Sequence, residues 1–159
     1  MSIGVARESG GRLLTFAVGG GIYALPIASV LEVAEVGGRA CIPTVPSDVA
    51  WVMNYHGDAL PVVRSSVLFD LAEASVPAPE HVLVITARST STPGFGLPVD
   101  RILGLVAGPG ALAHDHEPIA ERRPIDGRVA NVLDAQRLVA KAREVIEQAL
   151  GRVERAQGR

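Results

Sequence analysis

The 159-residue chain has little of several things that would point to particular function classes. It has one cysteine, Cys41, so no internal disulfide can form, which is typical of a reducing compartment. Its formal net charge of −2 argues against a broad basic surface for nucleic acid. No apolar run reaches the roughly 20 residues of a membrane span, and the first residues lack the apolar core of a signal peptide. We therefore expect a cytoplasmic protein with no nucleic-acid partner and no membrane insertion.

Apolar residues are plentiful, and they occur in short segments. The chain is 48% hydrophobic and 20% charged, which is enough apolar material for a packed core. Its 17 glycines and 11 prolines divide it into short pieces rich in Val, Ile and Leu, a pattern typical of strands. The expected strands are 13–18, 22–25, 30–36, 49–55, 59–63, 81–87, 94–99, 102–107 and 129–133. With about ten strands in two groups of five, the sequence predicts a mainly β fold of small barrels or a sandwich.

One segment near the end has helical periodicity. Apolar residues recur there at spacings of three and four, and Asp134 precedes them as a suitable N-cap. The stripe consists of Leu138, Ala142, Val145, Ile146, Ala149 and Val153. We expect a flexible N-terminus over 1–11, one domain over 12–150 and a polar tail over 151–159. Within the domain we expect subdomain one at about 12–72, subdomain two at about 80–134 and a helix at about 135–150.

Two groups of polar residues were considered as catalytic or metal sites. His114 and His116 alternate with two carboxylates and could bind zinc, but no further Cys/His set supplies the usual remaining ligands, so a solvated loop is favoured. His56 and Asp58 could join Ser65 or Ser66 in a hydrolase triad, but no Gly-x-Ser-x-Gly motif exists. We therefore predict no catalytic residues, no metal and no cofactor.

Two further features have simple structural interpretations. Cys41 stands beside Ile42 with no histidine nearby, which favours a small buried hydrophobe over a reactive thiol. The run Glu121-Arg122-Arg123 is typical of a solvated loop.

The order of short motifs along the chain resembles the CheW-like family. The opening segments LTFAVG (14–19), YALPI (23–27) and VLEV (30–33) are followed by a PxxPxxV pattern (43–49), VMNYHG (52–57) and LPVV (60–63). GLPVDRIL (96–103) and DGRVANVLD (126–134) resemble later family motifs. The resemblance runs from about residue 13 to residue 150, and its specificity comes from the order and spacing of the motifs.

This resemblance implies two five-stranded SH3-like barrels packed side by side, with a C-terminal helix. It also implies a non-catalytic adaptor that bridges the cytoplasmic tip of a chemoreceptor to the regulatory domain of the histidine kinase CheA. Other CheW-like proteins are further candidate partners, and recruitment to receptor arrays follows from such a role. The implied partner-binding positions are Ile27, Val30, Glu32, Trp51, His56, Gly57, Val82 and Leu83. Ile27 and Val30 would equally suit a purely structural place in the core.

The chain departs from the family pattern at four places. Trp51 stands where the family usually has glycine, His56 where it has arginine, and Arg64 where it has aspartate. The segment 118–126 is shorter than usual and basic. Because three of these changes alter size or charge in the central signature, we expect altered or selective partner contacts. An accessory CheW-like protein that has lost kinase binding is the alternative, and a small metal-binding or hydrolytic protein is the third reading.

Overall fold

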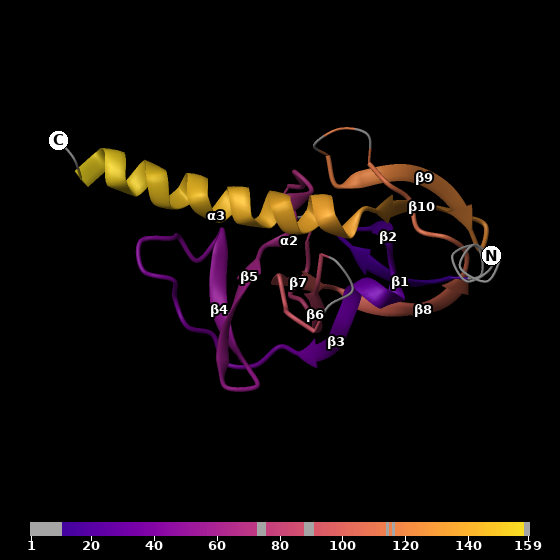
Figure 1. The fold of residues 1–159 in the computed structure, drawn as a ribbon, viewed down its shortest axis with the longest axis horizontal. Helices are drawn as coiled ribbons and strands as arrows, with labels where there is room; N and C mark the ends of the chain where they lie inside the picture. Colours follow the sequence, from indigo (N-terminus) through magenta and orange to yellow (C-terminus); the bar gives the residue numbers. More distant parts are fainter. Residues whose placement is uncertain (1–10, 73–75, 88–90, 114, 116, 158–159) are drawn as a thin grey trace.

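The computed structural model describes residues 11–72, 76–87, 91–113, 115 and 117–157, with side chains described up to residue 151. The described part is mainly β, as predicted, and ends in a long helix (Figure 1). Its elements are β1 (Arg12–Val18), β2 (Gly21–Pro26), η1 (Ile27–Ser29), β3 (Val30–Glu35), β4 (Ala50–Tyr55), β5 (Asp58–Val63), α2 (Ser65–Leu68), β6 (His81–Ile85), β7 (Phe95–Val99), β8 (Arg101–Ala107), β9 (Ile119–Ile125), β10 (Arg128–Leu133) and α3 (Ala135–Gln157).

The strands form two five-stranded sheets, which confirms the two predicted groups of five. The strand order is β8-β1-β2-β10-β9 in the first sheet and β3-β6-β7-β5-β4 in the second. Strand pairing among the described residues closes neither sheet into a barrel, so each sheet keeps two edge strands. In the second sheet an isolated antiparallel bridge joins Val52 of the edge strand β4 to Ala40, in the connection between β3 and β4.

The sheets do not correspond to the expected subdomains of residues 12–72 and 80–134. The first sheet combines β1 and β2 with β8, β9 and β10, whereas the second contains β3 to β7. The chain crosses between the sheets at η1 and again at Asp100. The Asp100 N–H donates to the Ala17 carbonyl at 2.9 Å, and its Oδ2 accepts the Gly19 N–H at 2.7 Å. A division by position along the chain does not separate the sheets, because β1 pairs with β8 and β2 pairs with β10.

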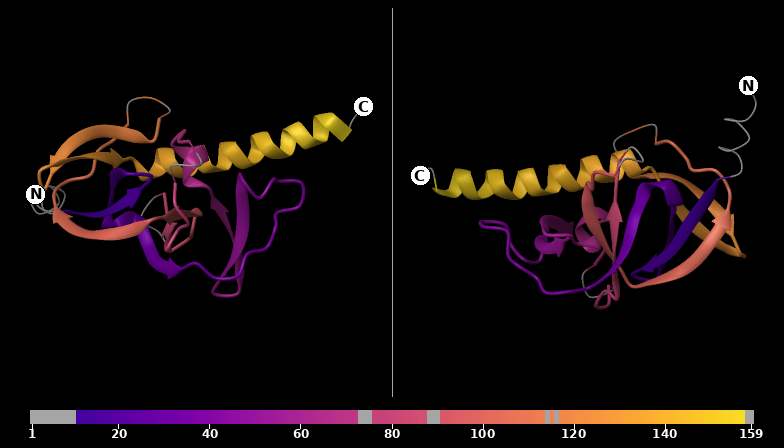
Figure 2. Two further views of the ribbon diagram at one scale, coloured as in Figure 1. Left: turned by 180° about the vertical axis from the view of Figure 1, so that it is seen from behind. Right: turned by 60° about the horizontal axis from the view of Figure 1, so that its bottom comes forward.

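Helix α3 lies along both sheets and continues beyond them (Figures 1 and 2). Leu138, Ala142 and Ala149 are buried in the main core, which the helix shares with both sheets. The Asp134 carboxylate accepts the N–H groups of Gln136 at 3.0 Å and Arg137 at 3.3 Å, which confirms the predicted N-cap. The helix ends at Gln157 rather than near residue 150, so Gly151 does not interrupt it. No helix of the described residues is both long and apolar enough to cross a membrane.

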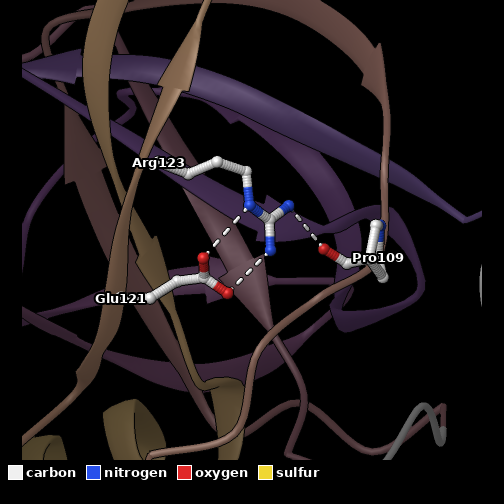
Figure 3. Close-up of polar contacts among 3 residues, drawn as sticks. All are labelled: Pro109, Glu121 and Arg123. Atoms are coloured by element: carbon white, nitrogen blue, oxygen red, sulfur yellow. Dashed lines mark hydrogen bonds and ion pairs between the residues drawn. The ribbon is translucent and has the colours of Figure 1, made fainter.

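Two sequence-based expectations outside the core are wrong. Glu121 and Arg123 lie in strand β9 rather than in a solvated loop. Figure 3 shows the Arg123 guanidinium donating to both carboxylate oxygens of Glu121, at 2.8 and 3.3 Å, and to the Pro109 carbonyl at 2.8 Å. The sequence of this strand did not predict a strand because it contains charged residues and Pro124. Both are acceptable in an edge strand, since one side of its backbone needs no hydrogen-bond partner. Cys41 is exposed rather than buried, because the connection between β3 and β4 runs over the surface.

Candidate functional site

Two of the predicted partner-binding residues are in direct contact. His56 Nε2 lies 3.0 Å from Glu32 Oε1, and the two side chains are 71% and 41% exposed. Glu32 belongs to β3 and His56 follows β4, the two opposite edge strands of the second sheet. The contact therefore connects the two edges at a solvent-accessible point.

The turn that carries His56 has a fixed geometry. His56 and Gly57 have φ values of 51° and 87°, and Tyr55 pairs with Asp58 across them. Two positive φ values in a two-residue hairpin are characteristic of a type I′ turn. The Gly57 N–H donates to Asn54 Oδ1 at 2.8 Å, and the Tyr55 and His56 rings meet edge to face at 4.4 Å. The imidazole is thus held at the tip of the hairpin.

Exposed apolar side chains occur on η1 and on one edge strand of each sheet. Ile27 on η1 is 39% exposed and Val33 on β3 is 42% exposed. Leu103 and Leu105 on β8 are 40% and 51% exposed. β3 and β8 are edge strands of different sheets, and Figure 1 and the right view of Figure 2 show them next to each other. Of these four residues, only Ile27 was among the predicted partner-binding positions. Leu103 and Leu105 alternate along β8, but this alternation indicates exposed residues only once β8 is known to be an edge strand.

An open groove continues from Ile27 towards the start of α3. Its volume is about 790 Å³, and η1, the segment 108–112 and the first turn of α3 line it. The lining is mostly apolar, and Leu112 on its border is 78% exposed. Ile27 therefore contributes to two adjoining apolar surfaces.

Three of the predicted positions have little access to solvent. Val82 and Leu83 on β6 are 1% and 0% exposed, and Val30 is half-buried against the main core. Their side chains therefore pack in or against the hydrophobic cores.

The divergent signature residues Trp51 and Arg64 lie together. Trp51 is 3% exposed and packs in the core of the second sheet with Met53, Leu60, Val62, Val82 and Val84. The Arg64 guanidinium lies 5.3 Å from the centre of the Trp51 ring, and that of Arg39 lies 4.1 Å from it. Trp51 thus enlarges a core and is not itself an exposed contact residue.

The groups considered for catalysis or metal binding are not assembled in the described structure. His56 contacts Glu32, whereas Ser65 is buried and its hydroxyl donates to the Pro98 carbonyl. No cluster of three or more His, Cys, Asp or Glu suited to a metal occurs among the described residues. His114 and His116 lie outside those residues, and Asp115 and Glu117 beside them are exposed.

Comparison with known proteins identifies the family. The model of the CheW-like domain matches residues 12–143. The chain belongs to the CheW-like domain family. A curated relative, the chemotaxis protein CheW of Treponema pallidum (strain Nichols), is 26% identical over 97 residues, which span 60% of this chain and 57% of the relative. The crystal structure of the scaffolding protein TtCheW from Thermoanaerobacter tengcongensis matches with a TM-score of 0.66 at 16% identity, covering 81% of this chain and 92% of that one. This structural likeness establishes the CheW fold, including the two five-stranded sheets and the helix.

Proposed function

We propose that this CheW-like protein is a non-catalytic cytoplasmic adaptor of a bacterial chemosensory array. It couples chemoreceptors to a CheA-type histidine kinase, and its contacts with these partners differ from those usual in the family. The observation that carries the proposal is the exposure of large apolar side chains on η1 and on the edge strands β3 and β8, namely Ile27, Val33, Leu103 and Leu105. Exposed apolar side chains of this kind are typical of protein-binding surfaces.

The Glu32–His56 pair is a separate accessible feature of β3. The imidazole approaches Glu32 from the β4–β5 turn, and the alternation of β3 places Glu32 and Val33 on opposite faces of the strand. We assign the receptor tip to the exposed apolar side chains of η1, β3 and β8.

A co-purification experiment tests the proposal. The chain is immobilised and offered the cytoplasmic receptor tip and the regulatory domain of the kinase from the same organism. We expect retention of the receptor tip and of the kinase domain. Retention of neither would overturn the proposal.

A matched pair of variants tests the surface itself. Val33→Asp places a charge in the apolar surface, whereas Val129→Asp makes the same change at a residue of β10 that is 62% exposed. We expect only Val33→Asp to weaken receptor binding, by about tenfold or more, because a carboxylate must be desolvated there. Equal binding by the two variants would exclude this surface.

An accessory protein without kinase binding is a second candidate, favoured by the altered residues Trp51, His56 and Arg64. It predicts retention by the receptor without the kinase. His56→Arg should then restore kinase binding, since arginine supplies a permanent planar cation. Trp51→Gly is a poor test, because removing a buried indole leaves a cavity that destabilises the second sheet.

A further inference from the structure

Arg39 and Arg64 both approach one buried indole ring. Their Cζ atoms lie 4.1 Å and 5.3 Å from the centre of Trp51, within the roughly 6 Å over which a cation–π attraction acts. The two guanidinium groups are therefore no farther apart than the sum of these distances. Trp51 thus brings two positive charges close together on the surface of the second sheet.

The contact with Trp51 leaves the hydrogen-bonding edge of Arg39 accessible. A guanidinium that lies over an aromatic ring still presents its N–H groups in a rigid fork, which matches a carboxylate. Arg39 is exposed, and no carboxylate of the described residues lies within ion-pair distance of it. Arg64 is half-buried, and its Nε donates to the Ser47 carbonyl at 3.4 Å. Arg39 is therefore the cation that is positioned to bind an external anion.

A groove beside Arg39 follows the outer edge of β4. Its volume is about 330 Å³, and Gly38, Arg39, Ala40, Gly57 and Asp58 line it together with residues 52–54 of β4. Val52 uses both its N–H and its carbonyl to pair with Ala40, at 2.8 and 2.9 Å. In an antiparallel strand, the N–H and carbonyl groups of every second residue point to the same edge. Those of Asn54, two residues after Val52, therefore point to the edge at which Val52 pairs with Ala40. The described residues contribute no backbone hydrogen bond to Asn54 on that edge.

We propose that this groove binds an extended acidic segment of a partner protein, with a carboxylate of the segment paired to Arg39. The segment extends the pairing of Ala40 with β4 to Asn54, as peptides do when they add to a sheet edge. Charge orients the segment, because Arg39 attracts an acidic residue, whereas Asp58 of the groove lining and Glu32, which contacts His56 beside it, repel one. This proposal does not depend on which chemosensory proteins the chain couples.

Trp51 is the only tryptophan of the chain, so its fluorescence reports on the site directly. The probe is an end-blocked Glu-Glu-Val-Thr-Val peptide, and its Gln-Gln-Val-Thr-Val counterpart is the uncharged control. We expect saturable binding of the acidic peptide with a change in Trp51 emission, and about tenfold weaker binding of the control, since hydrogen bonds between charged groups are the stronger ones. Equal binding of the two peptides, or none, would overturn the proposal.

Arginine variants identify the residue responsible. By isothermal titration calorimetry, Arg39→Ala and Arg39→Gln should each weaken the acidic peptide about tenfold, and Arg39→Lys less, because lysine keeps the charge but not the planar fork. Arg128→Ala removes an exposed arginine from β10 in the other sheet and should bind as the unchanged protein does. Arg39 variants with unchanged affinity, or an equal loss in Arg128→Ala, would show that no specific site exists. Neither receptor nor kinase is present in this assay, so its outcome is separate from that of the proposed function.

Discussion

Glu32 and His56 join the two edges of the second sheet through a contact of 3.0 Å between a carboxylate oxygen and a ring nitrogen. The residues are 24 positions apart, and their strands β3 and β4 are the outermost members of the sheet order. Where the family usually has arginine, this chain has a residue that is charged only when protonated. The contact is therefore made by an imidazole in place of the planar guanidinium of the family pattern.

A double-mutant cycle with Glu32→Ala and His56→Ala should measure how strongly the two side chains are coupled. Because both side chains are well exposed, we expect a coupling free energy of at most about 1 kcal/mol. Chemical denaturation of the four proteins measures it. In the His56→Arg protein we expect a coupling with Glu32 that is at least as large, because a guanidinium can bind a carboxylate through two N–H groups. No measurable coupling in either protein would contradict the expectation.

Gly96 lies where a side chain cannot be accommodated. A Cβ atom there would stand 2.7 Å from Val82 Cγ1 and 3.0 Å from Val62 Cγ2, both in the core of the second sheet. Gly96→Ala should lower the free energy of unfolding by about 1–3 kcal/mol through overpacking. Gly104→Ala on β8 is the matched control, because nothing lies within 4 Å of its Cβ position, and it should change stability by less than about 0.5 kcal/mol. Similar urea midpoints for the two variants would show that the core around Gly96 adjusts.

Much of the fold could be predicted because its signals are local. Glycine turns, alternating strands and the Asp134 cap depend on neighbouring residues only, and the structure confirms them. The membership of the sheets could not be predicted in this way, because β1 and β2 pair with strands about a hundred residues later. β9 was missed for a related reason, since its charges and Pro124 are acceptable only at an edge.

The site could be predicted less well than the fold. Motif positions indicated Glu32, His56 and Ile27, which are accessible, but also Val82 and Leu83, which are not. A sequence does not distinguish an exposed Val from a buried one on a strand until the sheet edges are known. The approach of Arg39 and Arg64 to the Trp51 ring follows from the paths of two separate segments, which no local pattern reveals.

Asp134 caps α3 and also bonds to the loop that borders the groove beside Ile27. Its Oδ1 accepts the N–H groups of Gln136 and Arg137, and its Oδ2 accepts that of Ala113 at 2.9 Å. Asp134→Ala removes both functions and should lower the free energy of unfolding by roughly 2–3 kcal/mol. Asp134→Ser keeps a good capping residue but is too short to reach Ala113 as well, so its loss should be about half as large. If the two variants were equally stable in thermal denaturation, the cap would contribute nothing, and if Asp134→Ser were as stable as the unchanged protein, the contact with Ala113 would contribute nothing.

Tyr23 should make the protein sensitive to alkali. Burial raises the pKa of its phenol above the usual value; Arg122 opposes this and Asp100 adds to it. Between the usual tyrosine pKa and the raised one, the native state keeps a proton that the unfolded state has lost. Because the native state then binds more protons, the free energy of unfolding decreases as the pH rises through this range.

Tyr23→Phe removes this titration and keeps the ring between Phe16 and Phe69, whose centres lie 6.0 Å and 4.5 Å from that of Tyr23. We expect the variant to lose less stability than the unchanged protein when both are taken from neutral to alkaline pH. Urea denaturation at each pH measures this difference, and the neutral values correct for any effect of losing the hydroxyl group itself. An equal loss in both proteins would mean that the alkaline sensitivity arises elsewhere in the chain.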